Sequence, residues 1–285
     1  MSNSTSKDQW AREGYVVAWS LFGTDVCESL LEISEGCLQQ WRECSPETGL
    51  AGGADATSMR HLNHPEYHRQ DHAGQVAILE AAADPTVLEL GRTILGEEPL
   101  FRCTSLFMNP LETGKDGNWH RDSQFLHPDV EEEERVVCTL GERGNSFQLQ
   151  VALVPSDDVE VVPGSHLRWD TPPEFAIRHG DEQRHNRSSD MPGALRLDLA
   201  PGDGAAFNPY SLHRGRYHTD RLRRTLMLTY SAESKPRSDY FSDQPWFLEK
   251  GCLDGLSSAA VGFYQRFIEQ YRGDWTKSAN TQDSR

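Results

Sequence analysis

The feature that most restricts the fold of this chain is a succession of short runs between Leu100 and Tyr230. The runs are β-branched or alternate between apolar and polar residues, and turn residues separate them, which is typical of antiparallel strands. We predict strands at 100–108, 118–125, 135–140, 147–154, 159–162, 194–198, 204–208 and 224–230. Eight short strands at these spacings indicate a jelly roll, so the predicted fold class is mainly β with flanking helices.

Helical patterns lie on both sides of this region. Residues 7–17 predict a short helix that breaks at Gly14, and apolar residues at helical spacing predict another from Thr24. Residues 45–73 have no clean period and predict a long loop, after which a helix begins at Gln75 or at Asp84. The predicted organisation is one domain, 1–285, with a helical and loop region at 1–98, the jelly-roll core at about 99–232, a helix at about 257–272 and a disordered tail at 276–285.

Charge and composition narrow the class of partner. The formal net charge of -16 disfavours binding to nucleic acid or to an anionic membrane, because phosphate binding requires a basic patch. No secretory signal and no long apolar run is present, and the six cysteines show no metal-binding spacing, which predicts free buried thiols. We expect a cytoplasmic monomer or homodimer that acts on a small molecule, without nucleic-acid or membrane partners.

The stretch from Asn118 to Asp122 carries the first candidate for chemistry. Alternate side chains of an extended strand share a face, so His120 and Asp122 can bind one ion. The same spacing recurs at His127/Asp129, His179/Asp181 and His218/Asp220, but only His120 follows strand-like sequence. An imidazole and a carboxylate supply two thirds of the two-histidine, one-carboxylate set that leaves half of an octahedral iron(II) open.

A third ligand and a cationic group follow later in the chain. A Pro-Gly-Asp turn at 201–203 separates two predicted strands, and His213 comes after the second, where it can complete the ligand set. Arg223 and Arg224 open the next apolar strand on opposite faces, so one of them must point into the barrel. A buried guanidinium needs a carboxylate partner, which a dicarboxylate cosubstrate would supply.

The order of several stretches carries a resemblance. They are Asp8 to Val17, His120-Arg121-Asp122, Val161 to His166, and Ala200-Pro201-Gly202-Asp203 leading to His213, with Arg224 eleven residues further on. This order, over roughly residues 8–232, resembles the phytanoyl-CoA dioxygenase family of iron(II)- and 2-oxoglutarate-dependent oxygenases. The resemblance implies a cupin-like double-stranded β-helix, iron held by His120, Asp122 and His213, and the distal carboxylate of 2-oxoglutarate on Arg224 rather than Arg223.

The resemblance also implies an activity. The expected enzyme uses iron(II), 2-oxoglutarate and O2 to hydroxylate a small, polar metabolite, with release of succinate and CO2. Two alternatives stay open: a non-catalytic cupin-like protein that binds a ligand or iron, and a metal-dependent jelly-roll enzyme that does not use 2-oxoglutarate. An inward-facing arginine distinguishes the first reading from both alternatives, because neither of them requires one.

Polar side chains near the predicted ligands suggest the nature of the pocket. Gln148 and Gln150 share one face of their strand, and their amides would lose hydrogen bonds on a packed face, so we expect them to line the barrel interior. We assign Gln150 to cofactor binding, and Asn118, Gln124 and Gln148 to the substrate. These amides favour a compact polar substrate.

Overall fold

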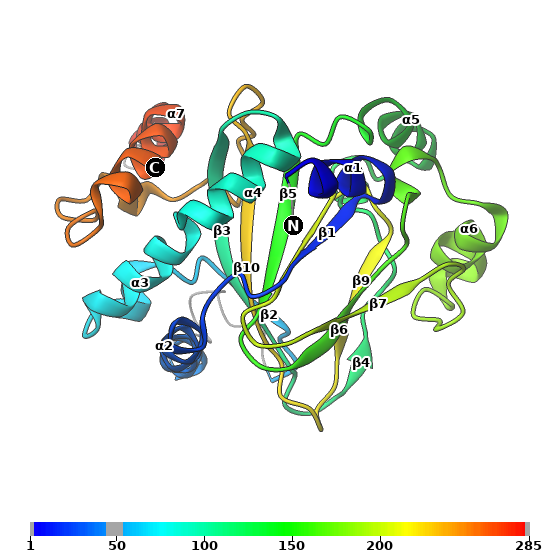
Figure 1. The fold of residues 1–285 in the computed structure, drawn as a ribbon, viewed down its shortest axis with the longest axis horizontal. Coiled ribbons are helices and arrows are strands. Elements are labelled where there is room, and N and C mark those ends of the chain that lie inside the picture. The colour runs from blue at the N-terminus through cyan, green and yellow to red at the C-terminus, as the bar shows by residue number, and fades with distance from the viewer. Residues whose placement is uncertain (1–2, 44–53, 283–285) are drawn as a thin grey trace.

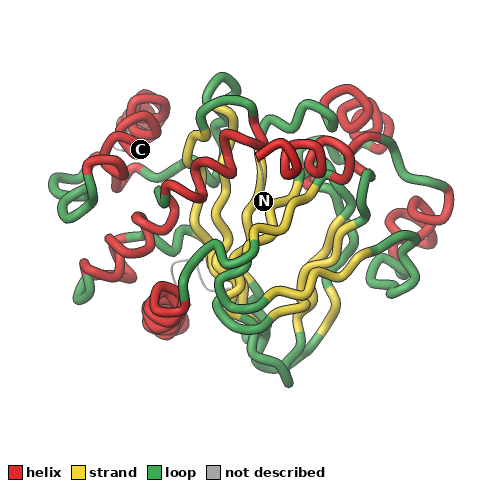
Figure 2. The backbone as a smooth tube through the Cα atoms, in the orientation of Figure 1, coloured by secondary structure: helices red, strands yellow, loops and turns green. Residues whose placement is uncertain are grey.

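The computed structural model describes residues 3–43 and 54–282, and two antiparallel sheets form its centre. In the larger sheet the strands follow the order β1 (Tyr15–Ala18), β8 (Gly204–Phe207), β5 (Ser146–Ala152), β10 (Arg224–Ala232), β3 (Pro99–Met108) and β2 (Ser58–Arg60). In the smaller sheet the order is β4 (Lys115–Asp116), β9 (His213–Tyr217), β6 (Ser156–Val161) and β7 (Leu195–Leu199). Figure 2 shows the two groups of strands facing one another across the barrel interior. The chain therefore has the predicted jelly-roll core.

Helices cover the outer face of the larger sheet. They are α1 (Asn3–Glu13), α2 (Thr24–Glu43), α3 (His72–Ala82), α4 (Pro85–Leu95) and α7 (Ser258–Gln282), while α5 (Val130–Leu140) and α6 (Pro172–His179) lie on the side of the smaller sheet (Figure 1). The start of α4 shows why the chain turns helical there: the Asp84 side chain accepts a hydrogen bond from the Thr86 N–H at 2.7 Å, and Pro85 occupies the first turn. The helix ends at Gly96, whose φ of 73° suits glycine.

Strand alternation divides the apolar residues into two cores. On β5, Phe147, Leu149 and Val151 belong to the core between the larger sheet and its helices. Ala152 faces the barrel interior, where it packs with Val159 and other residues of β6, β7 and β8. Apolar side chains therefore fill the part of the barrel interior next to Ala152. The polar residues on the same face of β5 line the rest of the interior.

Several predicted elements differ from the structure. The predictions of strands at 118–125 and 135–140 are wrong. In the first segment only His120 pairs with another strand residue, and 122–125 form a 3-10 helix. The second segment belongs to α5, where Val136 and Val137 are buried at helical spacing beside Glu133 and the Asp129 side chain accepts from the Glu132 N–H. Conversely, β9 was not predicted, because His-Arg-Gly-Arg-Tyr contains no β-branched residue.

The flanking regions are also more ordered than predicted. Residues 58–60 of the predicted loop form β2, residues 65–68 form a 3-10 helix, and 45–53 lie outside the described residues. Two helices, α3 and α4, replace the single one predicted, and α7 extends past 272 into the predicted tail, of which 283–285 are not described. Cys138 is exposed, in contrast to the expected burial, and Cys44 lies outside the described ranges. No helix within 3–43 and 54–282 is long and apolar enough to span a membrane.

Candidate metal centre

Three side chains predicted to bind metal come together at one end of the barrel. Their candidate ligand atoms, one each from His120, Asp122 and His213, all lie within 4.8 Å of one another. The backbones of His120 and His213 exchange two hydrogen bonds of 3.0 Å, which fixes the two imidazoles side by side. The Asp122 N–H donates to the Pro209 carbonyl at 2.8 Å, so the carboxylate is anchored to the segment that leads to His213. Backbone pairing therefore brings together residues that are far apart in the sequence.

Hydrogen bonds to backbone carbonyls set the tautomer of both histidines. The Nδ1 of His120 lies 2.7 Å from the Asn118 oxygen, and the Nδ1 of His213 lies 2.9 Å from the Ser211 oxygen. A carbonyl oxygen only accepts, so each Nδ1 donates and Nε2 is the ring nitrogen left to bind a metal. These Nε2 atoms lie 3.6 and 3.7 Å from Asp122 Oδ1. Burial, aided by the nearby His120, lowers the pKa of His213 to about 4, which keeps this ring neutral at ordinary pH.

The second oxygen of Asp122 has its own partner. Gln148 donates from Nε2 to Asp122 Oδ2, which leaves Oδ1 directed at the two imidazoles. The donor set is thus two imidazole Nε2 atoms and one oriented carboxylate oxygen. Such a set suits a divalent iron that keeps open positions for other ligands.

Arg121 lies between the two ligands in sequence but points away from them into a buried cluster of charges. It donates to Asp170 Oδ1 at 2.7 Å and to the Ser165 carbonyl at 2.7 Å, and both side chains of the Arg121–Asp170 pair are fully buried. Arg178 of α6 donates to the other oxygen of Asp170 at 2.7 Å and to both oxygens of Glu133 at 3.0 Å. The cluster of Arg121, Asp170, Arg178 and Glu133, called here the buried ion cluster, fastens the ligand segment to α5 and α6.

A cavity of about 380 Å³ opens beside the ligands. The residues that line it include the three ligands, Gln148, Gln150, Gly215, Tyr217, Met227, Thr229, Arg60, Arg102, Arg237, Phe107 and Phe241. Its volume lies in the range of small-molecule sites. The two glutamines line the barrel interior, as their shared strand face predicted.

The two neighbouring arginines face opposite ways, and the structure corrects their predicted orientation. Arg224 shares its face of β10 with Leu226 and Leu228 of the outer core, and its guanidinium donates to Glu35 of α2 at 2.6 Å. Arg223 has the opposite orientation and is 1% exposed, with Nη2 3.5 Å from Gln150 Oε1. Arg223, and not Arg224, is therefore the arginine on the interior side of the sheet.

Arg223 retains capacity for a ligand. Its Nε is buried without a hydrogen-bond acceptor among the described residues, and the nearest carboxylate oxygen, on Asp158, is 3.9 Å away. The residue beside the Arg223 guanidinium, Gly215, has no room for a side chain. A Cβ at Gly215 would come within 2.7 Å of the Tyr217 hydroxyl and within 2.9 Å of Arg223 Nη1.

Two predicted substrate residues lie elsewhere. Asn118 is exposed and accepts from Arg187 Nε at 2.8 Å, while Gln124 accepts from Arg178 at 3.0 Å beside the buried ion cluster. Neither side chain lines the cavity beside the metal ligands. The sequence analysis missed Arg60, Arg102 and Arg237, which do line it. Strand alternation could have identified Arg60 only if β2 had been recognised within the predicted loop.

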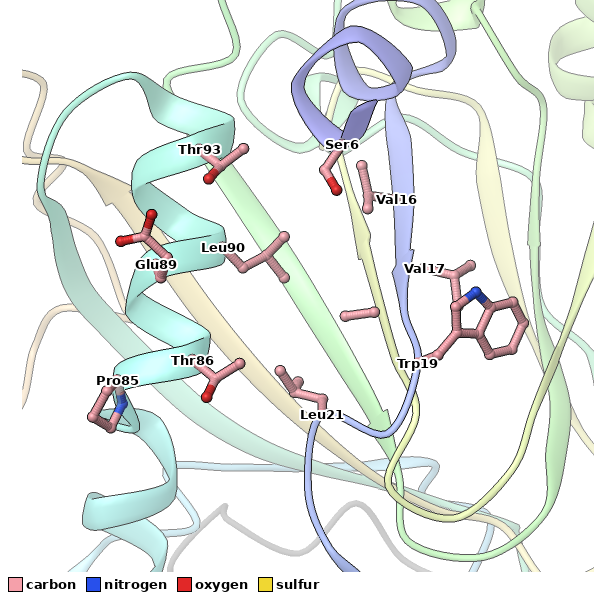
Figure 3. A pocket seen from close by; sticks show the side chains of 11 residues that line it. Ser6, Val16, Val17, Trp19, Leu21, Pro85, Thr86, Glu89, Leu90 and Thr93 are labelled. Atoms are coloured by element: carbon pink, nitrogen blue, oxygen red, sulfur yellow. The ribbon is translucent and has the colours of Figure 1, made fainter. Parts of the chain in front are cut away.

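A larger cavity, of about 630 Å³, lies outside the barrel between α1, β1 and α4. Figure 3 shows Thr86, Leu90 and Thr93 of α4 on one side of it and residues of β1 on the other. Glu89 is the only one of its lining residues that could offer a metal-ligand atom. The larger cavity therefore lacks a cluster of candidate metal ligands, whereas His120, Asp122 and His213 place such a cluster beside the smaller one.

A family model, phytanoyl-CoA dioxygenase (PhyH), matches residues 10–225 of this chain. A comparison with curated protein sequences found no match. Among solved structures, EctD from S. alaskensis, crystallised with 2-oxoglutarate and 5-hydroxyectoine, has a TM-score of 0.60 and 20% identity, covering 91% of this chain and 86% of that one. EctD has also been crystallised with bound Fe.

Two further solved structures have the same fold. AviO1 from Streptomyces viridochromogenes Tue57 has a TM-score of 0.57 and 15% identity, covering 84% of this chain and 98% of that one. SnoN, a non-heme alpha ketoglutarate dependent epimerase from nogalamycin biosynthesis, has a TM-score of 0.55 and 17% identity, covering 81% and 83%. At 15–20% sequence identity, the similarity to these solved structures shows a shared fold.

Proposed function

The chain belongs to the phytanoyl-CoA dioxygenase family, and on that premise we propose that it is an iron(II)- and 2-oxoglutarate-dependent oxygenase that hydroxylates a compact polar metabolite. The observation that carries this proposal is the convergence of two imidazole nitrogens and one oriented carboxylate oxygen beside a cavity that is lined by both polar and apolar side chains. This donor set fits iron(II) with open coordination positions. Bound there with 2-oxoglutarate, iron would supply the activation of O2 that accompanies release of succinate and CO2.

The residues around the cavity would divide the remaining tasks. His120, Asp122 and His213 hold the metal, and Gln148 keeps Asp122 oriented through its second oxygen. Arg223 is suited to the distal carboxylate of 2-oxoglutarate, because its buried Nε lacks an acceptor and a charge-assisted bond would provide one. Gln150, 3.5 Å from Arg223, belongs to the same end of the cavity. This reading transfers to Arg223 the role expected of Arg224.

The proposal is tested by oxygen consumption and succinate release with iron(II) and 2-oxoglutarate. The wild-type protein should convert 2-oxoglutarate, slowly without substrate and faster with it. His120→Ala, Asp122→Ala and His213→Ala should each lose both bound iron and turnover, because each removes one of three ligands.

Two histidines of the same local spacing serve as matched controls. His127 lies 3.0 Å from Glu132, and His218 lies 3.3 Å from Asp116, so neither belongs to the ligand set. His127→Ala and His218→Ala should keep iron and activity. Iron retained without any 2-oxoglutarate turnover would favour the non-catalytic cupin-like reading, and substrate oxidation without 2-oxoglutarate would favour the other alternative.

A further inference from the structure

One wall of the cavity carries alternating arginines and aromatic rings. The guanidinium of Arg60 lies 5.0 Å from the Phe107 ring centroid and 5.2 Å from that of Phe241. The Arg102 guanidinium lies 5.3 Å from the same Phe241 ring centroid. Asp239 connects Arg102 to Arg237. It accepts a hydrogen bond from Arg102 and forms an ion pair with Arg237. The name cationic wall is used here for Arg60, Arg102 and Arg237.

The charges of the cationic wall are not balanced by the chain. Asp239 is the one carboxylate within 4 Å of these three guanidiniums among residues 3–43 and 54–282. Within the described part of the chain, the Arg60 side chain has one hydrogen-bond partner, the Ser105 hydroxyl, 3.3 Å from Nη1. Arg102 is 4% exposed and pairs with Asp239, and its buried Nε has no acceptor among the described residues. The unbalanced charge therefore lies on the partly buried Arg60 and Arg237, which line the cavity, where an anion can join them.

The cationic wall meets the arginine proposed for 2-oxoglutarate at one end, where Arg60 and Arg223 lie 5.0 and 5.4 Å from the same Phe107 ring centroid, and it extends away from Arg223 at its other end. Arg223 precedes the first residue of β10, whereas Arg237 follows its last residue, Ala232. Between them, Thr229 pairs with Gln148, the partner of Asp122. Arg237 lines the same cavity as His120, Asp122 and His213. The metal centre therefore lies between Arg223 and the far end of the cationic wall.

We propose that the substrate of this oxygenase is an anion, and that its carboxylate or phosphate group binds to Arg60, Arg102 and Arg237. This inference rests on the proposed function, because it assigns Arg223 to 2-oxoglutarate. The three guanidiniums carry three positive charges and Asp239 carries one negative charge. The excess of two positive charges would attract the anionic group of the substrate. Phe107 and Phe241, which also line the cavity, offer apolar surface to the carbon skeleton next to that group.

The test is a calorimetric titration of anaerobic protein loaded with iron(II) and saturating 2-oxoglutarate. The probes are matched pairs that differ in one group: short-chain carboxylic acids against their primary amides, and phosphate monoesters against their free alcohols. At least one acid or phosphate should bind roughly tenfold tighter than its neutral partner, because charge-assisted hydrogen bonds to guanidinium are the stronger kind. Arg60→Gln and Arg237→Gln should remove most of this preference.

Arg266→Gln is the matched control, because Arg266 of α7 pairs with Glu98 and Glu233 on the outer side of the sheet. It should keep the preference for the anion. The same titration of the metal-free Arg223→Gln variant leaves only the cationic wall to bind the probes, so its outcome stands even if 2-oxoglutarate does not bind. The inference is overturned if no anion binds, if neutral members bind equally well, or if the preference survives in Arg60→Gln and Arg237→Gln.

Discussion

The buried ion cluster and the cationic wall both concentrate arginines near the metal ligands, but their charges are balanced differently. In the cluster two arginines face two carboxylates, and the Arg121 and Asp170 side chains have no exposed surface. On the wall Asp239 pairs with Arg102 and Arg237, and Arg60 has no carboxylate partner among the described residues. Matched charges in a closed space hold the structure together, whereas unmatched charges beside a cavity are suited to a ligand.

The largest expected effect is on the matched side of this comparison. Asp170→Asn removes the carboxylate that joins Arg121 to Arg178, and leaves two buried guanidiniums with one carboxylate. The free energy of unfolding should fall by about 3–5 kcal/mol in urea denaturation, since an unpaired buried charge is costly. Asp181→Asn, which disturbs an exposed pair with Arg184, should cost less than about 1 kcal/mol. Equal losses in the two variants would show that the buried cluster has no special structural role.

An intermediate effect is expected at Gln148, which connects the cavity wall to the metal ligands. Gln148→Leu removes the hydrogen bond to Asp122 Oδ2. Iron affinity, measured by competition with a chelator, should fall roughly 10–100-fold, as is usual when the partner of a metal ligand is lost. Gln150→Leu is the control on the same strand face, and it should leave iron affinity unchanged. An unchanged affinity in Gln148→Leu would mean that Asp122 needs no orienting partner.

The smallest effect is expected on the cationic wall itself. Arg237→Gln removes one positive charge from a set that exceeds its carboxylates, and the Arg237 side chain is 41% exposed. The free energy of unfolding should change by no more than about 0.5 kcal/mol. Asp239→Asn should be clearly more destabilising, because it leaves the buried Arg102 without its carboxylate. A large loss in Arg237→Gln would instead assign the wall a structural role.

The sequence predicted the parts of the molecule that depend on local pattern. The jelly roll and α4 with its Asp84 cap followed from alternation and capping, and the structure brings together His120, Asp122 and His213, the set that the family resemblance implied. Val136 and Val137 misled the prediction, because β-branched residues also occur on buried helix faces. His120 reaches His213 through a single pair of backbone bonds, so its segment needed no full strand.

The arginines were harder to place, because orientation depends on register. Arg223 and Arg224 have the same chemistry, and a shift of one residue exchanges their faces. The structure settles their orientation through Glu35, a partner from α2 that no local pattern connects to β10. The cationic wall likewise joins β2, β3 and the segment after β10, and only tertiary contacts bring these together.

The most direct test of the account is the affinity for 2-oxoglutarate of anaerobic, iron(II)-loaded wild-type protein, Arg223→Gln and Arg224→Gln. Arg223→Gln should weaken binding by roughly tenfold or more, because it removes the cationic partner of the distal carboxylate. Arg224→Gln should change the affinity by less than about twofold, because Arg224 is engaged by Glu35 outside the barrel. Weaker binding in Arg224→Gln than in Arg223→Gln would contradict the assigned register and the role of the barrel interior.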